Sequence, residues 1–190
     1  MAKRYRHRIN NRENLKIWTI LCLVLVCFAA IALRGFIVYS VYPLEHKDEI
    51  KESSEKYSLD KHMVCAVIYT ESHFDEQAVS GRGAVGLMQV MPDTGAWAAE
   101  KMGLEGFSPE KLPQPEVNIA IGCWYLNYLT ELFDGDMRKV LAGYNAGPNR
   151  VQSWINSEGA LIDIPYEETE KYLEKVLRYY EIYKGLYKDF

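Results

Sequence analysis

Glu71 is the first residue of this sequence whose type and surroundings indicate chemistry. It continues a stripe formed by Val64, Val67 and Ile68 on a predicted helix, with the spacing i, i+3, i+4 and i+7. A carboxyl group at the end of an apolar stripe is partly removed from water, which raises its pKa, and the helix dipole acts in the same direction. Such an acid stays protonated near neutral pH and can act as a general acid. The alternative is an ordinary glutamate that bends into solvent.

A glycine-rich segment, residues 80–92, contains the second candidate. Gly81, Gly83 and Gly86 allow a sharp turn or a close approach to a ligand. The segment lacks the Gly-Lys-Ser/Thr ending of a phosphate loop. Gln89 is polar among apolar neighbours, and a buried amide needs hydrogen-bond partners, which a substrate could supply. The alternative is a structural turn in which Gln89 bonds to the backbone.

Further candidates lie closer to the C-terminus. Tyr144 and Asn145 belong to the segment Gly-Tyr-Asn-Ala-Gly-Pro at the end of a predicted helix. Their side chains would form hydrogen bonds beside a forced turn, although the same residues are common where helices end. Tyr172 lies on the aromatic face of the last predicted helix, where such residues usually belong to the core. Amphipathic aromatic rings suit sugar stacking as well as a small helical core.

The elements that must position these residues are predicted to be helices. Ser58 offers an N-cap for the helix that carries Glu71. Another helix opens at Pro92, and the last begins after Pro165. No segment shows sustained alternation of apolar and polar residues, so at most a small β element is expected, around residues 78–90.

The N-terminal part predicts a membrane segment. Residues 17–33 form a run of seventeen residues without a charge, and after Arg34 the apolar character continues to residue 42. A spanning helix needs about 20 apolar residues, and an arginine near its end can reach the headgroups. Residues 1–16 contain six basic side chains and one acidic side chain, which predicts a cytoplasmic N-terminus. The alternative is a signal peptide that is cleaved after Ala32.

Charge is distributed unevenly along the chain. The formal net charge is −4, but residues 17–190 carry 16 basic and 25 acidic side chains. This excludes a uniformly basic surface for nucleic acid, and a hydrophobic content of 48% excludes a disordered chain. We therefore expect four parts: a basic cytoplasmic tail (1–16), a transmembrane helix or signal anchor (17–42), a juxtamembrane stalk or first polar helix (43–56) and a folded domain (57–190).

No residue pattern indicates a metal or a cofactor, and none is expected. The histidines are scattered, and the sequence has no Cys-x-x-Cys motif. Cys22 and Cys27 lie in the apolar segment as small hydrophobic residues. Cys65 and Cys123 lie in the outer domain, whose compartment permits a disulfide, but two free buried thiols fit their apolar helical contexts equally well.

Four ordered motifs together resemble the lytic transglycosylases of the soluble-lytic-transglycosylase (SLT) domain type, relatives of goose-type lysozyme. The motifs are Glu71-Ser72, the segment from Ser80 to Gln89 with GAVGLMQVMP, GYNAGP at residues 143–148, and Glu168-Thr169-x-x-Tyr172. The resemblance covers about residues 55–185. It implies a mainly α, lysozyme-like catalytic domain with minimal β structure. It also implies cleavage of the β-1,4 bond between N-acetylmuramic acid and N-acetylglucosamine in peptidoglycan.

The resemblance implies a role for each matching residue. Glu71 matches the single catalytic acid and base, and Ser72 matches the neighbour that helps to position the substrate. The residues expected to bind substrate are Ser72, Ser80, Gly86, Met88, Gln89, Tyr144, Asn145 and Tyr172. No second carboxylate lies in a motif that suggests a catalytic partner. Glu71 would therefore protonate the leaving oxygen and then take the proton of the muramic C6 hydroxyl, which closes a 1,6-anhydro ring.

Two alternatives to this reaction remain at the level of the sequence. One is a hydrolytic muramidase of the same fold, and the other is a membrane-tethered peptidoglycan-binding or assembly module without catalysis. The expected partners are peptidoglycan glycan strands and membrane lipid around the N-terminal helix. No nucleic acid is expected, and partners in the cell-wall machinery stay open. The expected location is the cell membrane, with a single span and an extracytoplasmic domain.

Overall fold

The computed structural model describes the backbone of residues 2–190 and the side chains of residues 14–190. It divides the chain into two compact units, residues 1–43 and residues 44–190. Of the predicted basic tail, residues 1–13 lie outside the described side chains. The division between the units falls next to the predicted end of the membrane segment.

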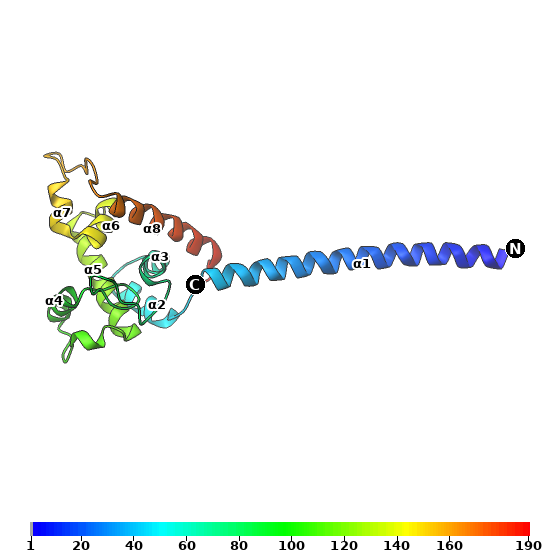
Figure 1. Ribbon diagram of the computed structural model, residues 1–190, viewed down its shortest axis with the longest axis horizontal. Coiled ribbons are helices and arrows are strands. Elements are labelled where there is room, and N and C mark those ends of the chain that lie inside the picture. Colours follow the sequence, from blue (N-terminus) through cyan, green and yellow to red (C-terminus); the bar gives the residue numbers. More distant parts are fainter. Residues whose placement is uncertain (1) are drawn as a thin grey trace. The chain divides into compact units, whose positions relative to one another are not determined.

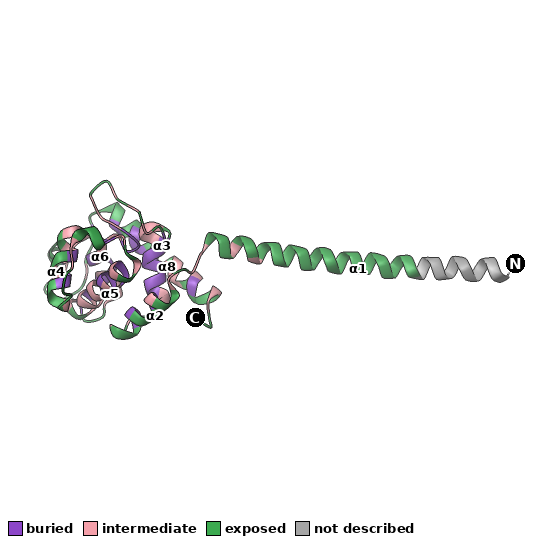
Figure 2. Ribbon diagram, turned by 90° about the horizontal axis from the view of Figure 1, so that it is seen from below, coloured by how far each residue is buried: buried purple, intermediate pink, exposed green. Residues whose placement is uncertain are grey.

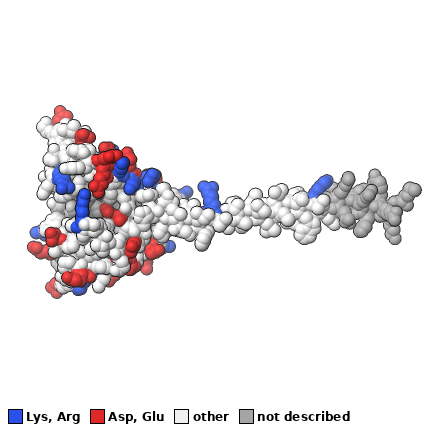
Figure 3. Space-filling model, viewed as in Figure 1, with Lys and Arg blue, Asp and Glu red and all other residues white. Residues whose placement is uncertain are grey.

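The first unit is one long helix, α1 (Ala2–Val41; Figure 1). Between Asn14 and Val41 this helix is long and apolar enough to cross a membrane. Its apolar side chains are exposed, as Figure 2 shows along its described length, and Phe28 is 74% exposed. A long stretch of its surface is also without charge (Figure 3). Apolar surface in water costs about 25 cal/mol per Å², so such a helix is suited to a lipid environment.

The second unit is built around α5 (Pro115–Leu132), which lies against α2, α4 and α6, while α3 lies against α8. The other helices are α2 (Lys47–Lys56), α3 (Lys61–Ser72), α4 (Pro92–Met102), the 3-10 helix η1 (Pro109–Lys111), α6 (Met137–Ala146), α7 (Pro148–Ser153) and α8 (Glu167–Leu186). Among the described residues, β structure is limited to the isolated bridges Val79–Val85, Val85–Val90 and Ile155–Leu161. The prediction of a mainly α fold with minimal β structure is confirmed.

The segment predicted as a stalk, residues 43–56, belongs largely to the second unit. It contains α2, which packs against both α3 and α5. Ile50 is fully buried there, and Ser53 and Ser54 are buried beside it. One apolar and two small side chains are enough to give this charged helix a contact face. The compact unit begins at Leu44 and therefore includes this segment.

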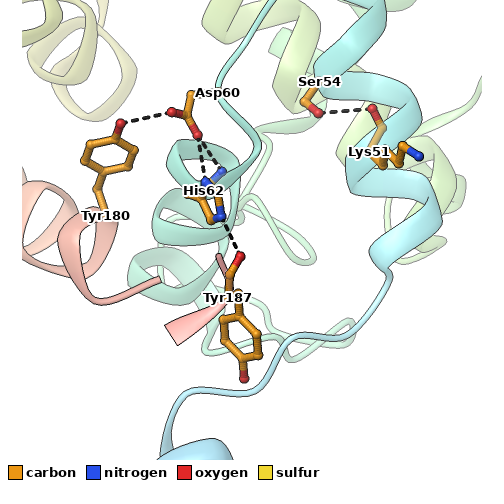
Figure 4. Close-up of polar contacts among 6 residues, drawn as sticks. All are labelled: Lys51, Ser54, Asp60, His62, Tyr180 and Tyr187. Atoms are coloured by element: carbon orange, nitrogen blue, oxygen red, sulfur yellow. Dashed lines mark hydrogen bonds and ion pairs between the residues drawn. The ribbon is translucent and has the colours of Figure 1, made fainter. Parts of the chain in front are cut away.

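The start of α3 differs from the predicted cap. Asp60 is the N-cap, and its carboxylate accepts a hydrogen bond from the His62 backbone N–H at 2.8 Å. Ser58 has a φ of 54°, which is outside the extended region that an N-cap residue adopts. Asp60 also accepts a hydrogen bond from the Tyr180 hydroxyl at 2.9 Å, and His62 Nε2 lies 3.0 Å from the Tyr187 carbonyl oxygen (Figure 4). These contacts tie the start of α3 to α8 and the C-terminal residues.

The buried side chain of Asn118 on α5 connects the glycine-rich segment to the helical core. Its Oδ1 accepts a hydrogen bond from the Met88 N–H at 2.7 Å, and its Nδ2 donates to the carbonyl oxygens of Val85 and Leu112, both at 2.8 Å. Gly86 lies over this amide with a φ of +79°, and a Cβ there would come 2.8 Å from the Leu112 carbonyl oxygen. Both the backbone angle and the close approach therefore require glycine.

Cys65 and Cys123 are fully buried free thiols. Burial raises the pKa of Cys65 to about 12, and it raises the pKa of Cys123 well above its usual value. Of the two interpretations that the sequence leaves open, the structure therefore shows free buried thiols.

We expect Asn118→Leu to lower the free energy of unfolding by about 3 kcal/mol or more, because three buried backbone groups lose their partner. Urea unfolding of the full chain in detergent, followed by tryptophan fluorescence, measures the change. Asn127→Leu on the same helix is the control, since the Asn127 side chain bonds to Glu131 at an exposed site. Equal stability of the two variants would contradict the role given to Asn118.

Candidate active site

Glu71 lies in the last turn of α3. Residues 63–69 of this helix are all buried, so the helix is fixed by the core along most of its length. It stops because His73 adopts a left-handed conformation with a φ of 55°. The Glu71 side chain faces a groove of about 660 Å³. The groove is also lined by predicted site residues from distant parts of the sequence, namely Ser80, Gln89, Tyr144 and Asn145.

The proton affinity of this site is set by burial. Burial raises the pKa of the Glu71 carboxyl to about 7, and the nearby Tyr172 hydroxyl lowers it part of the way back. Among the described residues, the buried Tyr172 hydroxyl makes no hydrogen bond of regular geometry. Burial, followed by the charge of Glu71, raises the pKa of Tyr144 and Tyr172 well above the usual value. Glu71 therefore exchanges its proton near neutral pH while both phenols keep theirs.

Ser80 and Gln89 organise the glycine-rich wall of the groove. The Ser80 hydroxyl oxygen accepts a hydrogen bond from the Ala84 N–H at 2.9 Å. The Gln89 Nε2 donates to the carbonyl oxygens of Ala78 and Gly86, at 3.1 and 3.0 Å, and its backbone has a φ of 48°. The structural turn, in which Gln89 bonds to the backbone, is therefore present, and Gln89 also lines the groove. Its amide nitrogen fixes the loop, which leaves the carbonyl oxygen as the acceptor for a donor in the groove.

Four residues predicted to bind substrate do not line the groove. One of them, Tyr172, is buried beside Glu71. The other three belong to the glycine-rich loop or contact it. Gly86 is buried over Asn118, and the fully buried Met88 lies against Gly122, where a Cβ would come 2.8 Å from the Met88 Cβ. The Ser72 hydroxyl donates to the Leu87 carbonyl oxygen at 2.8 Å. All three position the loop beside Glu71 through the core.

Hydrogen bonds also fix the end of α6. The Tyr144 hydroxyl donates to the Met88 carbonyl oxygen at 2.9 Å. The Asn145 Oδ1 accepts a hydrogen bond from the Thr169 hydroxyl of α8 at 2.8 Å, which turns its amide nitrogen toward other acceptors. A second cavity of about 230 Å³ shares Gln89, Met91, Tyr144 and Asn145 with the groove. The binding space therefore continues past these residues.

Three charged residues of the groove, Arg82, Arg150 and Glu168, are not among the residues predicted from the sequence. Glu168 belongs to the motif Glu168-Thr169-x-x-Tyr172, and its place beside Thr169, the partner of Asn145, is the signal that could have identified it. Arg82 lies within the glycine-rich segment, but nothing in its local pattern distinguishes it from a solvent-exposed turn residue. Arg150 carries no local signal.

The family model named Transglycosylase SLT domain matches residues 48–166. The protein belongs to this family. The chain is 34% identical, over 156 residues, to the soluble lytic murein transglycosylase of Escherichia coli K12. The match covers 78% of this chain and 24% of that protein. It is 32% identical, over 118 residues, to the membrane-bound lytic murein transglycosylase C of Yersinia enterocolitica, with coverages of 57% and 33%. The chain thus spans a minor part of each relative.

Solved structures give the same assignment. The 70-kDa soluble lytic transglycosylase of Escherichia coli matches with a TM-score of 0.73 and 33% identity, over 78% of this chain and 25% of that chain. An inactive variant of the lytic transglycosylase Slt of Pseudomonas aeruginosa, with one glutamate changed to glutamine, matches with a TM-score of 0.71 and 33% identity, over 76% and 24%. The predicted lysozyme-like fold of the SLT domain is thereby confirmed.

We expect Glu71→Gln to stabilise the SLT domain at high pH. Folding raises the pKa of Glu71 from its ordinary value of 4.5 to about 7, so the native state holds this proton more tightly than the unfolded state. The free energy of unfolding of the wild type therefore falls as the pH rises through this interval. At pH 8 the variant should be more stable by up to ~3 kcal/mol, and near pH 4 the difference should vanish. Urea unfolding at both pH values measures this, and a less stable variant at pH 8 would contradict the assignment.

Proposed function

We propose that this SLT domain is a peptidoglycan lytic transglycosylase that cleaves the β-1,4 bond between N-acetylmuramic acid and N-acetylglucosamine. The observation that carries the proposal is the partly buried acid Glu71, whose pKa is about 7, in a groove of about 660 Å³. The names of the relatives support it, since they are soluble and membrane-bound lytic murein transglycosylases. The inactive glutamine variant of a structural neighbour supports a glutamate in the central role.

In the first step Glu71 acts as a general acid. Its proton passes to the glycosidic oxygen, the bond from that oxygen to the muramic C1 breaks, and Glu71 is left as a carboxylate. The muramic N-acetyl oxygen stabilises the positive charge that develops at C1. The neighbouring Tyr172 hydroxyl lowers the pKa of Glu71 and so favours the carboxylate that this step produces.

In the second step Glu71 acts as a general base. Its carboxylate takes the proton of the muramic C6 hydroxyl while the C6 oxygen forms a bond to C1. The product is a 1,6-anhydro ring, and Glu71 regains the proton that it lost, so no water is consumed. Gln89 and Asn145 line the groove with amide groups that suit the hydroxyl and N-acetyl groups of the sugars.

A hydrolytic reaction is the second candidate, because a further carboxylate, Glu168, lines the same groove. In that reaction a water molecule would attack C1 with the help of a carboxylate. Glu168 is 72% exposed and pairs with Arg82, whereas burial and Tyr172 account for the pKa of Glu71. These surroundings favour the reaction that uses Glu71 alone.

We expect wild-type protein to release 1,6-anhydromuramic products from purified peptidoglycan, and Glu71→Gln to lower the rate at least about a hundredfold, because the proton donor is removed. Mass spectrometry of the products and a zymogram give the readouts. Glu131→Gln, at an exposed position on α5, is the control and should keep full activity. Reducing muramic ends without anhydro products would identify the hydrolytic reaction, and near-normal cleavage by Glu71→Gln would refute the role of Glu71.

We further propose that α1 anchors the SLT domain in the cell membrane by a single span. The apolar stretch from Asn14 to Val41 supports the anchor, and the basic residues before it support a cytoplasmic N-terminus. The domain would then act outside the cytoplasm on glycan strands near the membrane. Membrane-bound relatives agree with this arrangement.

We expect the full chain to stay with membranes after an alkaline wash, and residues 44–190 alone to be released. The reason is that most of the exposed large apolar side chains belong to α1. Protease added outside spheroplasts should digest the domain and leave a protected N-terminal fragment. The mass of the mature protein tests the alternative of a cleaved signal peptide. Cleavage after Ala32 would remove most of α1, and the proposal that α1 is a membrane anchor would then be wrong.

A further inference from the structure

Arginine is concentrated at the groove. Residues 44–190 contain four arginines, and two of them, Arg82 and Arg150, line the cavity that contains Glu71. The same residues 44–190 carry 15 basic and 25 acidic side chains, so the presence of two arginines in one groove is unusual for this domain. Two glutamates, Glu71 and Glu168, line the groove with them. A chain of neutral amino sugars does not need guanidinium groups for binding. Their position indicates an anionic group on the ligand.

Arg82 is held by a partner that a ligand can replace. Its Nη2 lies 3.6 Å from the Oε2 of Glu168, and the two side chains are 79% and 72% exposed. An exposed ion pair of this kind contributes about 1 kcal/mol or less. A ligand carboxylate that forms two parallel hydrogen bonds with the guanidinium would compete successfully with Glu168.

Within the described residues, the Arg150 guanidinium leaves most of its N–H donors available to a ligand. Its guanidinium carbon lies 5.7 Å from the centre of the Tyr166 ring, and Tyr166 in turn packs against Trp154. Its Nη1 makes one long hydrogen bond, of 3.4 Å, to the Ala146 carbonyl oxygen. Within residues 14–190 no carboxylate forms an ion pair with Arg150. The aromatic contacts orient the planar group while most of its N–H donors remain for the groove.

We propose that Arg82 and Arg150 bind a carboxylate carried by the substituent of the muramic acid unit, and that they make the groove selective for charged strands. This inference rests on the proposed function for the identity of the glycan. In peptidoglycan such a carboxylate has two sources. It belongs either to the peptide stem or, after removal of the stem, to the exposed lactyl group.

The test uses three substrates with the same sugar chain: strands with carboxylate-bearing stems, strands whose stem carboxyls are all amidated, and strands stripped of stems. Binding is measured with the full-length Glu71→Gln protein in detergent, and product release is measured with the wild type. We expect one of the charged substrates to bind roughly five- to tenfold more tightly than the amidated one, and salt to weaken this preference. A preference for stem-bearing strands identifies the stem as the source, and a preference for stripped strands identifies the lactyl group.

Substitutions assign the preference to the two arginines. Arg82→Gln and Arg150→Gln, each added to the binding protein, should reduce the preference, and the double variant should bind all three substrates alike. Arg138→Gln is the matched control, because Arg138 forms an exposed pair with Glu170 at the same 3.6 Å but does not line the groove. It should keep the full preference.

Two results would overturn the inference: equal binding of charged and amidated strands, or a preference that survives in the double variant. Either result leaves the proposed function standing if anhydro products are still released. The opposite outcome is a binding preference that depends on the arginines, without any release of anhydro products. It would refute the proposed reaction but support the binding of a carboxylate by Arg82 and Arg150.

Discussion

The three hydrogen bonds of the Asn118 side chain determine where the glycine-rich segment lies relative to the helical core. Met88 gives its N–H to Asn118, and its carbonyl oxygen accepts the Tyr144 hydroxyl, so the same contact also fixes the end of α6. The Thr169 hydroxyl then connects α8 to Asn145. Distant parts of the sequence therefore meet around Glu71 through a chain of directional polar contacts, which apolar packing alone would not specify.

Two electrostatic requirements are met in one groove. A guanidinium beside a carboxyl group lowers its pKa by roughly 1–3 units, which would remove the proton that Glu71 needs to donate. Burial and Tyr172 account for the pKa of Glu71, and no arginine contributes to it. Arg82 and Glu168 instead remain largely exposed, where water screens them. The groove thus keeps a neutral acid and cationic side chains at separate places, so that each retains its own chemistry.

The parts of the structure that depend on local rules could be predicted from the sequence. Pro92 opens α4, because proline fits the first position of a helix. The last helix begins at Glu167, shortly after Pro165. The position of Glu71 followed from helical spacing. The parts that depend on tertiary contacts were missed. Asn118 has a partner 30 residues away in Met88. The helix α2 is highly charged, and its packing against α3 and α5, with Ile50 buried, depends on tertiary contacts. Asp60 rather than Ser58 is the cap of α3, since Asp60 has an extended backbone whereas Ser58 is left-handed with a φ of 54°.

The buried, neutral thiols of Cys65 and Cys123 have a consequence for how the domain is made. A thiol that stays protonated and shielded reacts slowly with oxidants and with other disulfides. The fold of residues 44–190 therefore does not depend on a disulfide between Cys65 and Cys123, so the redox potential around the domain does not alter this part of its covalent structure.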